Sequence, residues 1–200
     1  MAMLMKHLVL KALEESIRVN EGFIKGNVDQ LLSVAQRLAT CFAAGHKLLI
    51  FGNGGSAADA QHIAAEFVNR FAVDRKPLPA MALTTDTSVL TSISNDFSFD
   101  EVFSKQIRAL GKRDDIAWGI STSGNSKNVL LAMEEARDMG LYTLALTGCG
   151  GGNLAQRCDL ALIVDSQATP RIQESHMTAA HIVCELVERI LFPESFMENR

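Results

Sequence analysis

The sequence predicts an α/β fold in which a parallel β-sheet is covered by helices on both faces. Short apolar runs alternate with stretches of helical periodicity, which is the pattern of a parallel sheet with crossover helices. Five such runs are present, at 47–51, 79–83, 116–120, 143–146 and 160–164. Their nearly continuous apolar character indicates strands that are buried on both faces. The chain has only four prolines and no low-complexity segment, so nothing in it suggests a linker.

Helical periodicity frames these strands. In residues 1–46, apolar side chains recur every three or four positions up to Gly45, where the pattern stops as at a helix C-terminus. A break near Gly26 and Asn27 divides this stretch into two helices, which we expect to form a helical hairpin; one long kinked helix is the alternative. Further helices are predicted at 57–71, 100–110, 127–139, 153–157 and, with Pro170 in its first turn, 170–192.

Length and composition restrict the class of protein. The chain has 200 residues, 48% of them apolar and 21% charged, which fits one globular domain: helices at 1–46, then an α/β core and C-terminal helix at 47–200. A net charge of −4 argues against a nucleic-acid partner. The apolar runs are too short to cross a membrane. Four cysteines without a CxxC motif, and no signal-peptide pattern, predict a cytoplasmic protein without disulfides.

Two predicted strand-to-helix loops have the chemistry of a phosphate site. The loop at 51–57 contains three glycines, and Ser56 stands where a helix N-cap is expected. The loop at 120–126 gathers four hydroxyls around one glycine, and Ser126 is its expected N-cap. Ligands of parallel sheets bind at the carboxyl ends of strands, and helix N-termini attract anions. Two such loops on one sheet predict a phosphate site; the alternative is that each is only a well-capped turn.

A histidine and a carboxylate share one face of the helix that follows the first loop. His62 and Glu66 are four residues apart, about 40° around a helix, so both can hold one metal ion or act as an acid–base pair. An intrahelical hydrogen bond on an exposed polar face is the plainer alternative.

The predicted C-terminal helix carries a second group of the same kind. Glu174 and His181 lie within about 20° of one face, whereas Gln173 and His181 are about 80° apart. Periodicity therefore favours Glu174 as the partner of His181 and leaves Gln173 second. His176 lies about 140° from His181, which predicts a different role for it.

Four segments together resemble the phosphoheptose isomerase family of sugar isomerase (SIS) domains. They are GNGGSAADAQHIAAE at 52–66, SNDF at 94–97, STSGNS at 121–126, and RIQESH at 171–176 with His181. The resemblance implies a flavodoxin-like, three-layer fold with a five-stranded parallel sheet, and a homotetramer whose sites are built between subunits. It also implies conversion of sedoheptulose 7-phosphate, a phosphorylated seven-carbon sugar, to D-glycero-D-manno-heptose 7-phosphate, the first step toward lipopolysaccharide heptose.

The resemblance also implies roles for individual residues. One Zn²⁺ per subunit is held by His62, Glu66, Gln173 and His181, which overrules the preference of periodicity for Glu174. The chemistry of such an isomerisation needs an acid–base pair for an enediol(ate) mechanism, and our hypothesis is that Glu66 and His181 form it, in either order. The substrate is bound by Asn53, Gly54, Gly55, Ser56, Glu66, Asn95, Asp96, Ser121, Thr122, Ser123, Ser126 and Gln173.

Two further readings remain open at this point. Some SIS relatives are non-catalytic regulators, one of which binds the bacterial replication initiator; they lack the counterparts of Glu66 and His181, which this chain keeps. The spacing of Gly52, Gly54 and Ala57 also fits a dinucleotide-binding loop, but the acidic residue expected about 20 positions later is missing. One departure from the family is Pro170, where some members carry an aspartate, so no role of that aspartate can be transferred.

Overall fold

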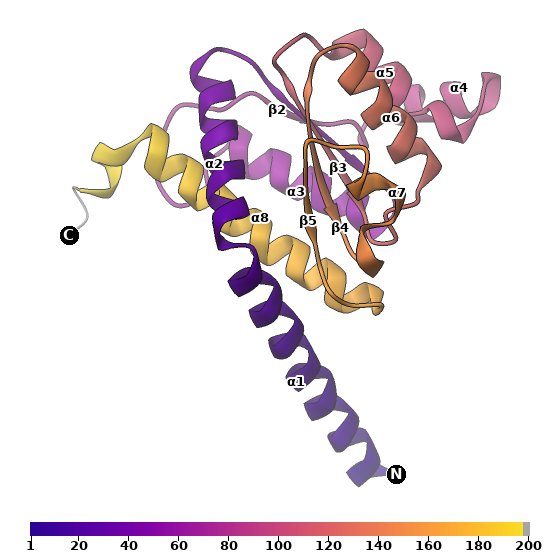
Figure 1. Cartoon of the computed structure of the whole chain (residues 1–200), viewed down its shortest axis with the longest axis vertical. Coiled ribbons are helices and arrows are strands. Elements are labelled where there is room, and N and C mark those ends of the chain that lie inside the picture. The colour runs from indigo at the N-terminus through magenta and orange to yellow at the C-terminus, as the bar shows by residue number, and fades with distance from the viewer. Residues whose placement is uncertain (198–200) are drawn as a thin grey trace.

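The five predicted strands pair into one parallel sheet in the computed structural model, which describes residues 1–197 (Figure 1). The strand order is β2-β1-β3-β4-β5, which is the flavodoxin-like order. Every neighbouring pair is parallel, as the sequence predicted. The strands are β1 (Leu48–Gly52), β2 (Ala80–Ala82), β3 (Ile116–Ser121), β4 (Tyr142–Thr147) and β5 (Leu160–Ile163).

Helices cover both faces of this sheet, and alternate residues of the strands pack against each layer. Leu48 and Ile50 of β1 belong to one buried cluster, and Leu49 and Phe51 belong to the other. The first cluster includes side chains of α2 (Val28–Ala43), α3 (Gly55–Val68) and α8 (Thr169–Leu191); the second includes those of α5 (Ser104–Leu110) and α6 (Lys127–Asp138). This confirms the three-layer arrangement.

The two N-terminal helices do not form the expected hairpin. Helix α1 (Ala2–Gly26) and helix α2 run end to end, and α1 projects away from the sheet (Figure 1). Asn27 alone separates them, and a reversal between antiparallel helices needs a loop of about two to five residues. The side chain of Asn27 donates to the carbonyl of Phe23 at 2.8 Å, so the kink is stabilised locally. The alternative of one long kinked helix describes this region better.

One helix was missing from the sequence prediction. Helix α4 (Thr87–Asp96) has Asp86 as its N-cap, and the carboxylate of Asp86 accepts from the backbone N–H of Val89 at 2.9 Å. Its sequence is rich in Thr and Ser, and none of its residues is fully buried, although Leu90 and Ile93 pack partly against the core. Its apolar period is therefore weak. The helix predicted at 100–110 is divided into a 3₁₀ turn, Phe99–Glu101, and α5. A short α7 (Gly152–Ala155) lies where 153–157 was predicted.

Two expectations about the whole chain can be compared with the structure. The four cysteines are free thiols, as predicted from their spacing. Within residues 1–197, no helix combines the length and the apolar character needed to cross a membrane.

Helix α8 carries a histidine that is fully buried in the core. The Nε2 of His176 lies 3.1 Å from the backbone carbonyl of Thr147 at the end of β4, and its Nδ1 has no partner among the described residues. Burial lowers the pKa of His176 to about 4, and the bond to Thr147 opposes this only in part. The imidazole is therefore neutral at pH 7, when Nε2–H donates to the carbonyl. This is the separate role that its helical position suggested.

We predict that His176 makes the fold sensitive to acid. Its pKa is near 6.5 in the unfolded chain and about 4 in the folded chain, so the unfolded chain binds the proton first. The free energy of unfolding should be fully retained above pH 6.5 and fall by roughly 3 kcal/mol as the pH drops to 4. Urea unfolding at several pH values tests this. In His176→Gln, the free energy of unfolding should no longer show this decrease between pH 6.5 and pH 4. A pH dependence equal to that of the wild-type protein would contradict the assignment.

Candidate functional site

The two glycine- and hydroxyl-containing loops lie side by side at the carboxyl edge of the sheet. They follow β1 and β3, which are paired, and the strand order reverses at this point, where ligands of such folds bind. The strands approach closely, since a Cβ on Gly52 would come within 2.8 Å of the backbone oxygen of Ile120. A hollow of about 130 Å³ beside the first loop is lined by Asn53, Gly54 and Thr84, among others.

Of the two serines expected as N-caps, Ser126 has that position and Ser56 does not. Gly54, with φ of +55°, is the N-cap of α3, so Ser56 lies inside the first turn of that helix and is buried. Glycine adopts this backbone conformation without steric cost. Ser126 is the N-cap residue of α6, but its side chain makes no capping bond. Its oxygen instead accepts from the hydroxyl of Ser121 at 3.0 Å.

An amide pair that the sequence analysis missed joins the two loops. Asn53 of the first loop and Asn128 of α6 exchange side-chain hydrogen bonds of 2.8 and 2.9 Å. Asn128 is buried, and its oxygen also accepts from the backbone N–H of Val129. The two asparagines are 75 positions apart in the sequence, so no local signal predicts this pairing. The pair fixes the relative position of the two helix N-termini.

The hydroxyl loop is packed against the loop that follows β4. Gly124 has φ of +66°, and a Cβ there would lie 2.1 Å from the carbonyl oxygen of Gly151, so only glycine fits. The backbone N–H of Gly148 donates to the carbonyl of Thr122 at 3.1 Å. Ser121 is buried, Thr122 and Ser126 are half-buried, and Ser123 is exposed, so the loop offers hydroxyls from its floor to its rim.

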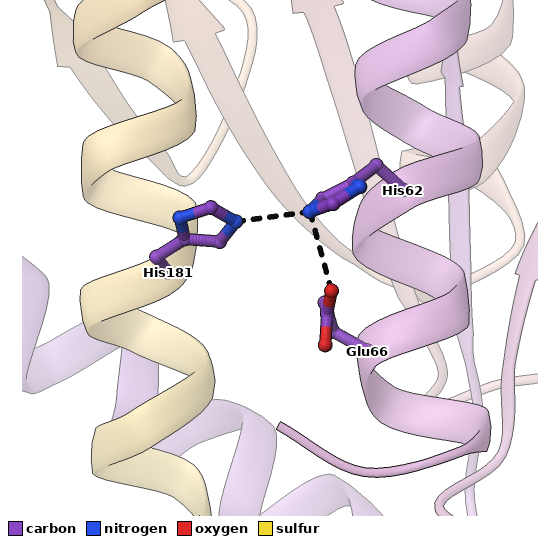
Figure 2. A group of neighbouring side chains, drawn as sticks. All are labelled: His62, Glu66 and His181. Carbon is purple, nitrogen blue, oxygen red and sulfur yellow. Dashed lines mark hydrogen bonds and ion pairs between the residues drawn. The ribbon is translucent and has the colours of Figure 1, made fainter. Parts of the chain in front are cut away.

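Two histidines and a glutamate meet where α3 lies against α8 (Figure 2). The Nε2 atoms of His62 and His181 face each other at 3.0 Å, and His62 Nε2 is 3.2 Å from Oε1 of Glu66. These ligand atoms all lie within 4.8 Å of one another. The His62 side chain is half exposed and that of Glu66 is 23% exposed, so solutes can reach the group. Phe71, which the sequence analysis did not single out, stacks on His181 with ring centres 5.4 Å apart.

The structure separates the two candidate partners of His181. Glu174 accepts from Ser16 of α1 at 2.7 Å and from Arg171 at 2.5 Å, so its carboxylate is used to attach α1 to α8. Gln173 instead lies over the N-terminus of α3, where a Cβ on Gly55 would meet its Nε2 at 2.3 Å. Gln173 therefore faces the first loop, and the periodicity-based preference for Glu174 is wrong.

Two of the expected sugar contacts lie elsewhere. Asn95 and Asp96 are exposed at the C-terminal end of α4 and share a hydrogen bond of 2.8 Å. Helix α4 packs against the 3₁₀ turn Phe99–Glu101, and Figure 1 places it away from α8. Within one described chain they are not grouped with the triad of His62, Glu66 and His181.

A carboxylate on α3 lies one turn before this triad. Burial raises the pKa of Asp59 to about 6, and the charge of His62 opposes the shift. One of its oxygens is buried and has no hydrogen-bond partner within residues 1–197. In the sequence, the position of Asp59 three residues before His62 is the only indication that it lies near the triad.

A larger cavity lies at the opposite edge of the sheet and has less defined chemistry. It has a volume of about 610 Å³ and is lined by Arg37, Asp114, Arg137 and Asp159, among others. Charges of both signs line it, and the guanidinium of Arg37 lies 4.5 Å from the centre of the Tyr142 ring. The carboxyl edge, with convergent hydroxyls, helix N-termini and the triad, is therefore the candidate site.

Comparison with known proteins identifies the family. The SIS domain family matches residues 13–148. A phosphoheptose isomerase of Nitratidesulfovibrio vulgaris is 53% identical over 187 residues, which are 94% of this chain and 90% of that protein. The chain belongs to the phosphoheptose isomerase family. A family member from Clostridium acetobutylicum is 47% identical over 97% of this chain and 100% of its own length.

Solved structures of the phosphoheptose isomerase family have the same fold. The enzyme of Neisseria gonorrhoeae is 43% identical and superposes with a TM-score of 0.87, covering 92% of this chain and 98% of its own. That of Francisella tularensis is 36% identical with the same TM-score, covering 94% of this chain and 100% of its own. The flavodoxin-like SIS fold predicted from the sequence is confirmed, and the regulator alternative is not favoured.

We predict that the triad binds Zn²⁺ and thereby stabilises the fold. Ligand at 100 times its Kd adds about 2.7 kcal/mol to the free energy of unfolding. For a chain of this size the Tm should rise by about 5–10 °C when zinc is added to metal-free protein. His62→Ala should abolish the rise. His46→Ala, at the opposite edge of the sheet, is the matched control and should keep it; an equal rise in all three proteins would place the metal elsewhere.

Proposed function

We infer that the chain is an aldose–ketose isomerase that converts sedoheptulose 7-phosphate to D-glycero-D-manno-heptose 7-phosphate. The observation that carries this inference is the triad of His62, Glu66 and His181 beside two phosphate-type loops, in a chain of the phosphoheptose isomerase family. The regulator alternative has no need of an accessible acid–base group. The product class, a heptose phosphate, suits the lipopolysaccharide precursor role proposed from the resemblance.

The phosphate is bound by the two loops at the carboxyl edge. Hydroxyls and free backbone N–H groups at the N-termini of α3 and α6 donate to its oxygens. These donors replace the arginine that many phosphate sites use. The residues assigned to this role are Ser56, Ser121, Thr122, Ser123 and Ser126. The Asn53–Asn128 amide pair supports the assignment because it keeps the two loops at a fixed separation.

The sugar extends from the phosphate toward α8. Asn53, Gly54, Gly55, Glu66 and Gln173 are assigned to it, and the contact of Gln173 with Gly55 supports this placement. Asn95 and Asp96 are assigned to the same substrate from the end of α4. Because α4 lies away from α8, their participation fits a site completed by another subunit.

Isomerisation moves a proton between C1 and C2 through an enediol(ate). Glu66 and His181 are the two groups for this transfer, one removing the carbon-bound proton and the other carrying the hydroxyl proton. The 3.0 Å contact of His181 with His62 and the 3.2 Å contact of His62 with Glu66 hold the two groups close together, which supports this assignment. The stacking of Phe71 on His181 restricts the imidazole and limits access of water from that side.

The donor set fits a zinc ion. Zinc bonds of about 2.0–2.1 Å in a tetrahedral shell place ligand atoms about 3.3 Å apart, close to the 3.0 and 3.2 Å separations in the triad. His62, Glu66 and His181 would hold the ion, with Gln173 as the proposed fourth ligand. When bound, the metal supplies Lewis-acid polarisation of the substrate's carbonyl and hydroxyl oxygens.

A homotetramer with shared sites is part of the proposal. Residues 12, 16 and 20 of α1 bond to α8, through Arg171, Glu174 and Thr178. The side chains of Leu10, Leu13 and Ile17 lie on the other side and are more than half exposed. An exposed apolar helix of this length needs a partner surface. We assign residues 1–200 to one SIS domain, and its free thiols support a reducing, cytoplasmic location.

Replacement of Glu66 by glutamine tests the acid–base role. Glu66→Gln keeps the shape of the side chain and removes its base, so turnover of sedoheptulose 7-phosphate by zinc-loaded protein should fall by about 10² or more. Glu185→Gln, a solvent-exposed change on α8, is the control and should keep full turnover. A Glu66→Gln protein with most of its activity would remove Glu66 from the mechanism.

A charge on α1 tests the assembly. Leu13→Glu changes a side chain that is 56% exposed in one chain, so the fold of each subunit should persist. Sedimentation should show tetramers for the wild-type protein and smaller species with reduced turnover for Leu13→Glu. Wild-type protein that sediments as a monomer and is fully active would contradict the shared site.

A further inference from the structure

A buried ion pair joins the segment after α3 to the last turns of α8. The Nε of Arg75 lies 3.0 Å from Oε1 of Glu188, and the two side chains are 1% and 0% exposed. Burying two charges is costly unless the remaining polar atoms are also satisfied. Because α3 and α8 carry the triad, the further hydrogen bonds of this pair bear on how the triad is held.

The carboxylate of Glu188 holds the chain that leaves α3. It accepts from the backbone N–H groups of Phe71 and Ala72, both at 2.8 Å, and of Val73 at 3.2 Å. Phe71 is the residue whose ring stacks on His181. Glu188 therefore fixes the backbone of a side chain that touches the imidazole.

The guanidinium of Arg75 holds the end of α3 itself. Its Nη2 donates to the backbone carbonyl of Glu66 at 2.8 Å, and its Nη1 donates to that of Phe67 at 2.6 Å. Further bonds from Nη1 reach the carbonyls of Asn69 and Lys76. These bonds satisfy carbonyls at the C-terminus of α3 that lack helical partners. The residue at the first of them, Glu66, belongs to the triad.

We propose that Arg75 and Glu188 are positioning residues for the triad. Arg75 holds the backbone of Glu66 on α3, and Glu188 holds the backbone of Phe71, whose ring contacts His181. The pair thereby fixes the distance between α3 and α8, across which the Nε2 atoms of His62 and His181 lie 3.0 Å apart. Neither residue contacts the reacting atoms. The inference rests on the proposed function only for its catalytic consequence; its consequence for metal binding stands separately.

Arg75→Lys is the sharpest test because it keeps the charge beside Glu188. A lysine ammonium cannot donate to Glu188 and to the carbonyls of Glu66 and Phe67 in the planar arrangement of a guanidinium. Zinc Kd, measured by calorimetric titration of metal-free protein, should rise by about 10–100-fold, as for other residues that orient metal ligands. In zinc-loaded protein kcat should fall by a similar factor. The KM for the sugar phosphate should change by less than about twofold, since the phosphate loops lie at the other end of α3.

Arg189→Lys is the matched control. Arg189 pairs with Glu185 on the same helix at 2.7 Å, but both side chains are about half exposed, and within residues 1–197 no hydrogen bond or ion pair joins either of them to α3. Its zinc Kd and kcat should equal those of the wild-type protein. Glu188→Asp is the second variant, because the shorter carboxylate cannot reach Arg75 and the three N–H groups together; it decides the question if Arg75→Lys does not fold.

The outcomes separate this inference from the proposed function. A folded Arg75→Lys protein whose zinc Kd and kcat lie within about twofold of wild type would overturn the positioning role and leave a purely structural ion pair. Wild-type protein that binds zinc but does not turn over sedoheptulose 7-phosphate would contradict the proposed function, while the zinc Kd of the variant would still decide the inference.

NMR spectra of the ring nitrogens of His62 and His181 in metal-free protein add a measurement that needs neither metal nor sugar. Arg75→Lys should change the chemical shifts of the ring nitrogens of both histidines.

Discussion

The packing of α3 against α8 is the contact on which the rest of this structure depends. His62 and Glu66 come from the first helix and His181 from the second, 119 residues later, and they have no common site unless these two helices cover the same face of the sheet side by side. The apolar clusters beneath them and the Arg75–Glu188 pair at their ends maintain that contact. A chemical group of three exposed or half-exposed side chains is thus held by residues that are almost entirely buried.

The second constraint is the parallel pairing of β1 with β3. It sets the two loops next to each other at the point where the strand order reverses, and the asparagine pair locks them together. Both helices that follow, α3 and α6, then point their N-termini at one place. Because α3 begins at the first loop and carries Glu66 near its end, a single helix connects the part of the site proposed to bind the phosphate with the part proposed to move a proton.

The strands, most helices and the two loops could be predicted from the sequence because their signals are local: apolar period, glycine clusters and capping residues. The prediction of a helical hairpin was wrong because the helical period of apolar residues breaks at Asn27 whether the chain kinks there or reverses its direction. Periodicity favoured Glu174 because the angle between two residues of one helix does not show which neighbouring helix each residue faces. Glu174 faces α1 and is bonded to it.

The roles of Asn128, Phe71, Arg75 and Glu188 could not be predicted from the sequence, because each of these residues acts through a partner that is far away in the chain. Periodicity left Gln173 as the second choice, and only the family resemblance placed it ahead of Glu174.

The most direct measurement is turnover of sedoheptulose 7-phosphate by the purified wild-type chain before chelation, after chelation and after Zn²⁺ is restored. NMR detection of the aldose product identifies the reaction as well as its rate. We expect D-glycero-D-manno-heptose 7-phosphate to form, chelation to abolish its formation and zinc to restore it. A zinc-loaded, folded protein that forms no heptose product would contradict this expectation, and the triad between α3 and α8 would then need another explanation.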